Sequence, residues 1–184
     1  AKMTLAEKLG QLQQLDGEAD GKFRPEHLEM ARKGLLGSTL NVRGAQQVNE
    51  LQKAALESRL KIPMLYGFDV IHGYRTIFPI PLGETASWDL AGVERNSAVA
   101  AAEARAAGVH WTFAPMVDIA RDPRWGRIME GAGEDTFLGS KMAFARVRGF
   151  QGLDYSANNR VLATAKHWVG YGAAEAGRDY NTTN

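Results

Sequence analysis

Residues 160–172 read RVLATAKHWVGYG, and this stretch is the most informative part of the sequence. A short apolar, β-branched run ends abruptly at Lys166 and His167 and continues as a glycine-rich loop. Inner strands of a parallel α/β sheet have this composition because both of their faces are buried, and ligands bind beyond their carboxyl ends. The stretch therefore predicts a buried strand with Lys166 and His167 as candidate site residues. A buried histidine beside a lysine with an apolar stem is the alternative interpretation.

The same alternation of short apolar runs and amphipathic segments extends over the whole chain. A capping box at Thr4 and Glu7 predicts that a helix begins the protein, and residues 16–25 form a polar stretch that we expect to be a loop. The predicted strands cover residues 35–41, 62–68, 109–116 and 160–166, and the predicted helices between them cover residues 48–55, 89–107 and 138–149. The sequence therefore predicts an α/β fold with about four strand–helix units around one parallel sheet.

Composition and charge exclude several classes of protein. The 184 residues fit one domain, their apolar fraction of 45% can form a core, and no apolar run reaches the roughly 20 residues of a membrane span. The 22 basic and 21 acidic residues are interspersed and give a formal net charge of +1, so we expect neither nucleic acid nor membrane as a partner. The chain has no cysteine, and its 4 histidines lack the spacing of metal ligands, so no metal and no cofactor are expected.

The second predicted strand ends in a carboxylate. Residues 66–73 read YGFDVIHG, which places Asp69 at the carboxyl end of the strand. A buried charge is costly there without a partner or a polar ligand, so Asp69 is a candidate acceptor for ligand hydroxyls. Because Asp is also a common turn residue, a cap of the following turn is the alternative role.

The third predicted strand leads into a loop that is rich in arginine. Its cations are Arg121, Arg124 and Arg127, and its carboxylates are Asp118, Asp122, Glu130 and Glu134. A planar guanidinium can form two parallel hydrogen bonds with hydroxyls or with a carboxylate. We therefore expect one arginine to face a site and the other two to brace the loop.

Three groups of residues, in this order, carry a family resemblance. The first is DVIHG at residues 69–73 with Phe78-Pro79, the second is APM at residues 114–116 with Arg121 to Arg127 and GED at 133–135, and the third is Lys166-His167 with GRDYN at 177–181. Together they resemble the amino-terminal domain of glycoside hydrolase family 3, of the bacterial periplasmic β-glucosidase type. The resemblance extends from Thr4 to the last residue.

The resemblance implies a (β/α)8 TIM-barrel type of fold and the hydrolysis of terminal β-linked glucose with retention of configuration. Such a barrel needs eight strands and about 250 residues, so residues 1–184 would be an incomplete amino-terminal part, about the first half. The positions that match the family's sugar-binding residues are Asp69, Arg127, Lys166 and His167. A neutral sugar suits this set, because its hydroxyls both donate and accept hydrogen bonds.

Aromatic residues lie near these positions in the sequence. Trp125, Trp168 and Tyr171 could each pack on an apolar face of a sugar ring. Packing inside the core or within a loop is the more frequent role of such side chains and stays open as the alternative.

No catalytic residue is assigned within this chain. Retaining hydrolysis needs two carboxyl groups about 5 Å apart, one as nucleophile and one as acid/base. In the family that the chain resembles, the nucleophile is an Asp in a Ser-Asp-Trp-like motif on a later strand, and the acid/base Glu lies later still, commonly in a second domain. Neither motif is present. We expect residues 1–184 alone to be inactive, with the remaining barrel and a second domain as partners and a β-glucoside or cello-oligosaccharide as substrate.

Other functions stay open at this point. One is a non-catalytic glucoside-binding or assembly half-barrel that pairs with a complementary segment. Another is a β-N-acetylglucosaminidase, in which a KHFPGHG-like string is expected, whereas residues 166–172 read KHWVGYG and lack the second histidine. A β-xylosidase activity is a third. Resemblance to periplasmic relatives implies a periplasmic or secreted protein, although no signal peptide precedes Met3.

Overall fold

The computed structural model describes residues 2–183 as two compact units. The first unit runs to Phe68 and also contains Ala106–Trp111, and the second contains Asp69–Arg105 and the residues from Thr112 onward. Every helix among the described residues is too short or too polar to cross a membrane. No group of three or more His, Cys, Asp or Glu side chains that could hold a metal ion occurs within residues 2–183.

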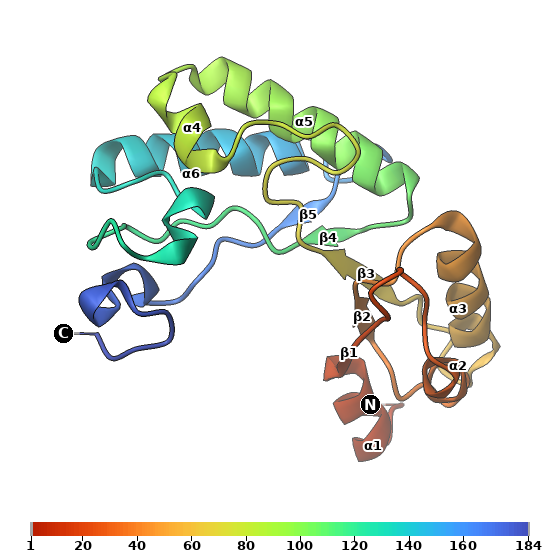
Figure 1. Cartoon of the computed structure of the whole chain (residues 1–184). Helices are drawn as coiled ribbons and strands as arrows, with labels where there is room; N and C mark the ends of the chain where they lie inside the picture. Colours follow the sequence, from red (N-terminus) through yellow and green to blue (C-terminus); the bar gives the residue numbers. More distant parts are fainter. Residues whose placement is uncertain (1, 184) are drawn as a thin grey trace. The chain divides into compact units, whose positions relative to one another are not determined.

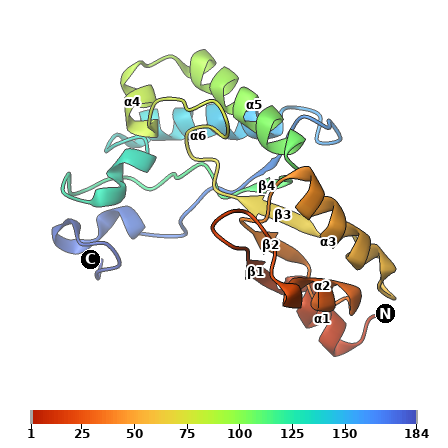
Figure 2. The same ribbon diagram turned by 45° about the vertical axis from the view of Figure 1, so that its right-hand side comes forward.

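The first unit is a small parallel sheet with helices packed against it (Figure 2). Its elements are α1 (Leu5–Leu12), β1 (Gln14–Asp16), α2 (Pro25–Arg32), β2 (Ser38–Leu40), α3 (Ala45–Glu57) and β3 (Leu65–Phe68). Ser38 is paired both with Gln14 of β1 and with Leu65 of β3, and both pairings are parallel. The backbone N–H of His110 donates to the carbonyl of Tyr66, so the chain entering the next strand lies beside β3.

Apolar periodicity explains why these segments fold against one another. Val48 and Leu51 lie on one face of α3 and are buried with Met64 and Tyr66, at and just before β3. The Tyr66 hydroxyl donates to the carbonyl of Val48 at 3.1 Å, which satisfies the only polar atom of that buried side chain. The predicted capping box begins α1: the Glu7 N–H donates to Thr4 Oγ1, and the Thr4 N–H donates to Glu7 Oε2.

The second unit contains three α-helices and the segments that follow the strand ends. It includes α4 (Pro81–Ala86), most of α5 (Leu90–Ala106), the end of β4 (Trp111–Thr112), α6 (Thr136–Gln151), β5 (Leu162–Ala163) and the 3-10 helices η1 (Gly126–Glu130), η2 (Tyr171–Ala173) and η3 (Glu175–Gly177). In Figure 1, α5 and α6 lie side by side. They approach closely because Gly149 on α6 faces the backbone of Glu94 on α5, where a Cβ would lie only 2.4 Å from the Glu94 carbonyl oxygen.

The chain after β5 pairs in parallel with the chain after β4. Thr164 N–H donates to the carbonyl of Ala114 at 2.9 Å, and Lys166 N–H donates to that of Pro115 at 3.1 Å. Val117 N–H in turn donates to the carbonyl of Lys166 at 2.7 Å. Within the first unit, strand neighbours follow the order of the chain, β1-β2-β3, as right-handed parallel crossovers favour.

The four predicted strands are present, each shorter than its apolar run, and the structure adds β1, α2 and α4. The predicted loop at residues 16–25 begins with Asp16, the last residue of β1. β1 has the sequence QLD, without a β-branched residue, so periodicity gives no strand signal there. The helix α2 begins at Pro25, whose fixed φ suits the first turn of a helix, although proline in a polar stretch equally indicates a loop.

A buried ion pair joins α4 to α6. Arg146 Nη2 lies 2.5 Å from Glu84 Oε2, and the two side chains are 6% and 7% exposed. Asn96 on α5 donates to the other carboxylate oxygen at 2.8 Å. Burial lowers the pKa of Arg146, and the charge of Glu84 opposes that effect. Three helices therefore share one buried polar cluster, in which each charge depends on its partner.

We expect Arg146→Met to lower the free energy of unfolding by about 3–5 kcal/mol, because it leaves the Glu84 carboxylate buried without its cation. Chemical denaturation monitored by circular dichroism measures the change. Arg148→Met is the matched control on the same helix: Arg148 pairs with Glu94 at 3.2 Å, with both side chains about 40% exposed, and its loss should cost less than about 1 kcal/mol. If both variants lose the same free energy of unfolding, the buried pair of Arg146 and Glu84 contributes no more than the exposed pair of Arg148 and Glu94, contrary to this prediction.

Candidate functional site

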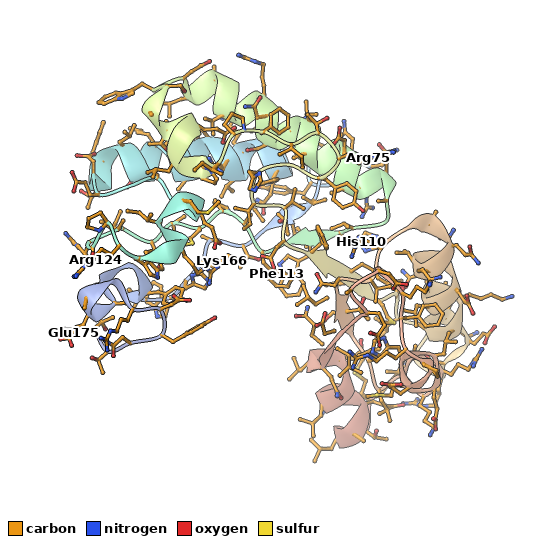
Figure 3. All side chains as sticks on the ribbon, in the orientation of Figure 1. Arg75, His110, Phe113, Arg124, Lys166 and Glu175 are labelled. Atoms are coloured by element: carbon orange, nitrogen blue, oxygen red, sulfur yellow. The ribbon has the colours of Figure 1, made fainter. Side chains whose placement is uncertain are left out.

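Two of the predicted site residues form an ion pair. Lys166 follows β5 and Asp69 follows β3, and Lys166 Nζ lies 2.8 Å from Asp69 Oδ1. The Lys166 side chain is 14% exposed and that of Asp69 is 46% exposed (Figure 3 labels Lys166). The pair therefore stands at the border between protein and solvent, where a carboxylate oxygen and an ammonium group can both reach a polar ligand.

His167 is held by a carboxylate from the neighbouring strand end. Asp118 Oδ2 accepts the backbone N–H of His167 at 3.0 Å and lies 2.9 Å from His167 Nδ1. The Asp118 side chain is 2% exposed, so its carboxylate is shielded from water. It contacts both the backbone nitrogen and a ring nitrogen of His167. The His167 ring also meets the edge of the Tyr171 ring, with centroids 4.7 Å apart. The imidazole is thus fixed in position by contacts on two different groups.

Arg127 is bound by Glu130 and lies over the Tyr171 ring. Its Nε and Nη2 donate to the two carboxylate oxygens of Glu130 at 2.6 and 2.8 Å, and its guanidinium carbon lies 5.4 Å from the Tyr171 centroid. The hydrogen bonds from Arg127 hold the pKa of Glu130 below its usual range against the effect of burial, and the charges of Arg127 and Lys166 lower it further. Glu130 and Arg127 therefore share an electrostatic environment with Lys166.

A second carboxylate, Asp179, orders the aromatic residues of the site. It accepts hydrogen bonds from Trp125 Nε1 at 2.9 Å and from the Tyr171 hydroxyl, and these donors lower the pKa of Asp179. Burial, together with the hydrogen bond to Asp179, raises the pKa of Tyr171 to about 12. Tyr171 therefore stays protonated at neutral pH, with its ring between His167 and Arg127.

The structure separates the three aromatic candidates. Trp125 is 2% exposed and packs edge-on against Tyr171 at 5.1 Å, which matches the packing role and leaves it unavailable to a ligand. Trp168 is 96% exposed. Tyr171 is partly buried among the site residues themselves.

The arginines of the loop divide into different environments. Arg124 forms two hydrogen bonds with the Asp122 side chain, at 3.0 and 2.6 Å, and holds the pKa of Asp122 at about 2. Figure 3 shows Arg124 apart from Lys166. Arg121 is exposed. Only Arg127 lies against Tyr171, although it too is paired with a carboxylate.

The structure brings all four predicted residues into one connected group. Asp69 bonds Lys166, His167 is the next residue, and Tyr171 lies between His167 and Arg127. Sequence reasoning gave no individual role to Asp118 or Glu130, which it counted only among the carboxylates of the loop. A signal for Asp118 was available, since it stands two residues after a predicted strand, much as Asp69 follows the strand before it.

Such a group suits a neutral ligand with several hydroxyls. Asp69 can accept hydrogen bonds, Lys166 and Arg127 can donate them, and the imidazole offers one further polar atom. Each cation already has a carboxylate partner within hydrogen-bond distance: Lys166 with Asp69, Arg127 with Glu130. A strongly charged ligand would have to compete with these partners.

The segment between β4 and η1 meets the chain after β5 at Gly172, which lies in η2. The Arg121 N–H donates to the carbonyl of Gly172 at 3.1 Å, and a Cβ on Gly172 would lie 2.3 Å from the carbonyl oxygen of Ile119 and 3.2 Å from Asp118 Cβ. Glycine is therefore required here by close approach of two backbones, beside the carboxylate that holds His167.

Comparison with known proteins gives one consistent result. The sequence model of the family described as "Glycosyl hydrolase family 3 N terminal domain" matches residues 4–184. A periplasmic β-glucosidase of Salmonella typhimurium is 42% identical over 100% of this chain and 24% of its own length. A periplasmic β-glucosidase/β-xylosidase of Dickeya chrysanthemi is 36% identical over 73% of this chain and 23% of its own length.

A solved structure matches the whole chain. The crystal structure of a mutant β-glucosidase from Listeria innocua in complex with laminaribiose is 41% identical, with a TM-score of 0.89, and the match covers 100% of this chain and 27% of that one. The predicted fold class, an α/β TIM-barrel type of which this chain forms about the first half, is confirmed. The chain spans about a quarter of the length of the relatives that it matches.

We expect Gly172→Ala to lower the free energy of unfolding by about 1–3 kcal/mol, because the new methyl group must displace the Ile119 carbonyl or shift the whole loop. Gly126→Ala is the control, since a Cβ at Gly126 meets no heavy atom within 4 Å. Thermal unfolding of both variants measures the difference. If Gly172→Ala is as stable as Gly126→Ala, the close approach described here is wrong.

Proposed function

This chain belongs to glycoside hydrolase family 3, within its amino-terminal domain, and we propose that the protein is a β-glucosidase that removes terminal β-linked glucose with retention of configuration. The observation that carries the proposal is the connected group of Asp69, Lys166, His167 and Arg127, at the positions where the sequence resembles the family's sugar-binding residues. In the proposal this group binds the hydroxyls of the first glucose residue.

Each side chain has a defined part in that proposal. Asp69 accepts hydrogen bonds from glucose hydroxyls, and Lys166 donates one while remaining paired with Asp69. Arg127 is held by Glu130 with one edge of its guanidinium, which leaves Nη1 to donate toward the Tyr171 hydroxyl, at 3.4 Å, or to a ligand. Where the charge of the sugar changes on the way to the transition state, contacts with these charged groups can be stronger in the transition state than in the bound substrate.

The reaction itself requires residues beyond this chain in the proposal. A retaining mechanism needs a carboxylate nucleophile and a carboxyl acid/base about 5 Å apart, and we assign neither role to residues 1–184. The remaining barrel and a second domain would supply them as the partners of this chain. Relatives named as periplasmic β-glucosidases support a periplasmic or secreted location as part of the same proposal.

A β-xylosidase activity is the second candidate. It is favoured by the relative in Dickeya chrysanthemi, which is named for both activities. Xylose lacks the hydroxymethyl group of glucose, so a group that binds ring hydroxyls can accept both sugars. Comparing kcat/KM for aryl β-glucoside and aryl β-xyloside with the full-length protein decides between the two.

We expect Asp69→Ala, Lys166→Ala and His167→Ala, each in the full-length protein, to lower kcat/KM for an aryl β-glucoside by about 10²–10³-fold. That factor corresponds to roughly 2–4 kcal/mol, the cost of losing a hydrogen bond to a charged group and leaving its partner unpaired. Lys141→Ala, on the exposed face of α6, is the control and should leave kcat/KM within about twofold. Binding of glucoside without any turnover by the unaltered protein would instead favour the non-catalytic binding module.

Arg127→Ala and Arg124→Ala should differ in their effect on kcat/KM. Losing Arg127 removes a group beside Tyr171 and leaves Glu130 without its partner, so we expect a fall in kcat/KM of about 10²-fold or more. Losing Arg124, which pairs with Asp122 on the outside of the loop and is 70% exposed, should change kcat/KM by less than about threefold. Kinetics per folded molecule, with thermal unfolding of each variant, separates activity from stability. The reverse order would assign the sugar-binding role to the wrong arginine.

A further inference from the structure

Asp118 is an almost completely buried carboxylate that the proposed sugar contacts do not use. Its side chain is 2% exposed, whereas the side chain of His167 beside it is 31% exposed. A buried carboxylate is costly unless donors surround it. Here the donors come from a single residue, because Asp118 Oδ2 lies 3.0 Å from the backbone nitrogen and 2.9 Å from Nδ1 of His167. Asp118 and His167 therefore form one unit.

The two contacts define where the imidazole carries its proton. A backbone N–H can only donate, so Asp118 Oδ2 is an acceptor in the contact with the backbone of His167. The same oxygen is then an acceptor toward Nδ1, which must hold a hydrogen to complete the bond. In a neutral imidazole with a hydrogen on Nδ1, the other nitrogen, Nε2, has a free lone pair and is an acceptor.

Other groups near His167 restrain its ring without setting this proton. Tyr171 meets the ring edge-on, at an interplanar angle of 82°, and so limits rotation of the imidazole. Lys166 precedes His167 in the chain and bonds Asp69. Arg127 and Glu130 pair with each other, and the Arg127 guanidinium lies over the Tyr171 ring. The contact that distinguishes the two ring nitrogens is the one with Asp118.

We propose that Asp118 is a positioning residue that fixes His167 as the Nδ1–H tautomer, so that Nε2 accepts a hydrogen bond from a hydroxyl of the substrate sugar. The identity of the ligand rests on the proposed function, but the proton on Nδ1 does not. The consequence is a division of polarity in the site: Asp69 and His167 accept from hydroxyls, and Lys166 and Arg127 donate to them. A hydroxyl that meets one acceptor and one donor is recognised by both its hydrogen and its oxygen.

Nitrogen NMR of the full-length protein with labelled histidine tests the tautomer directly. Residues 1–184 contain 4 histidines, and His167→Gln identifies the signals of His167 by their loss. We expect Nδ1 to be the protonated nitrogen of His167 and Nε2 the unprotonated one, near neutral pH. A protonated Nε2, with or without a hydrogen on Nδ1, would overturn the proposal. This measurement does not depend on any enzymatic activity, so it stands even if the proposed hydrolysis is not found.

Kinetics in the full-length protein tests the consequence for the substrate. Asp118→Leu removes both acceptor oxygens at similar volume, and we expect kcat/KM for an aryl β-glucoside to fall by about 10–100-fold, the usual effect of losing an orienting partner. Asp118→Asn keeps one acceptor oxygen and should recover part of that loss. Asp122→Asn, the same change four residues later at a carboxylate that pairs with Arg124, is the control and should stay within about threefold.

A double-mutant cycle separates positioning from a general structural effect. If Asp118 acts through His167, then adding Asp118→Leu to His167→Ala should lower kcat/KM by no more than about twofold, because the group that Asp118 orients is already gone. Losses that multiply in the double variant would show that Asp118 acts independently and would overturn the proposal. Should Asp118→Leu fail to fold, the same cycle with Asp118→Asn and the tautomer of the unaltered protein still decide the question.

Discussion

The parallel pairing of the chain after β5 with the chain after β4 is the constraint on which the candidate site depends. Thr164 and Lys166 donate to the carbonyls of Ala114 and Pro115, and Val117 donates back to Lys166. In a parallel pair both chains run the same way, so both carboxyl ends open at one edge. That direction is why His167 meets Asp118, although 49 residues separate them in sequence.

Charge pairing shapes what this edge can bind. Lys166 lies beside Asp69 and Arg127 beside Glu130, each within hydrogen-bond distance. These two pairs of opposite charge cancel at a distance but remain strong hydrogen-bonding groups at contact range. Such an arrangement suits a neutral, hydroxyl-rich ligand better than a phosphate or a carboxylate. Acidic and basic side chains therefore balance within the site, as they nearly do in the whole chain.

Rigidity beneath the site comes from a different cluster. The buried pair of Glu84 and Arg146 joins α4 to α6, Asn96 adds α5, and Arg146 Nη1 also lies 3.5 Å from the carbonyl of Ile71. Ile71 stands two residues after Asp69, so this cluster also contacts the segment that presents Asp69. A site of several hydrogen-bonding groups needs such support, because misplacement of a single group weakens its contact.

The sequence by itself predicted four strands and the candidates Asp69, Lys166 and His167, because apolar periodicity and polar strand ends are local properties of a chain. The barrel type of fold and the choice of Arg127 among the loop arginines were implied by the resemblance to the family. Apolar periodicity missed the strand at Gln14–Asp16, where three residues without β-branching pair only because β2 lies beside them. Only the tertiary structure shows which side chains contact one another: Trp125 packs in the core, and Asp118 binds His167. The partner of a side chain depends on which chain segments come close in space. Neither the composition of the sequence nor the spacing of its residues gives the distance between two such segments.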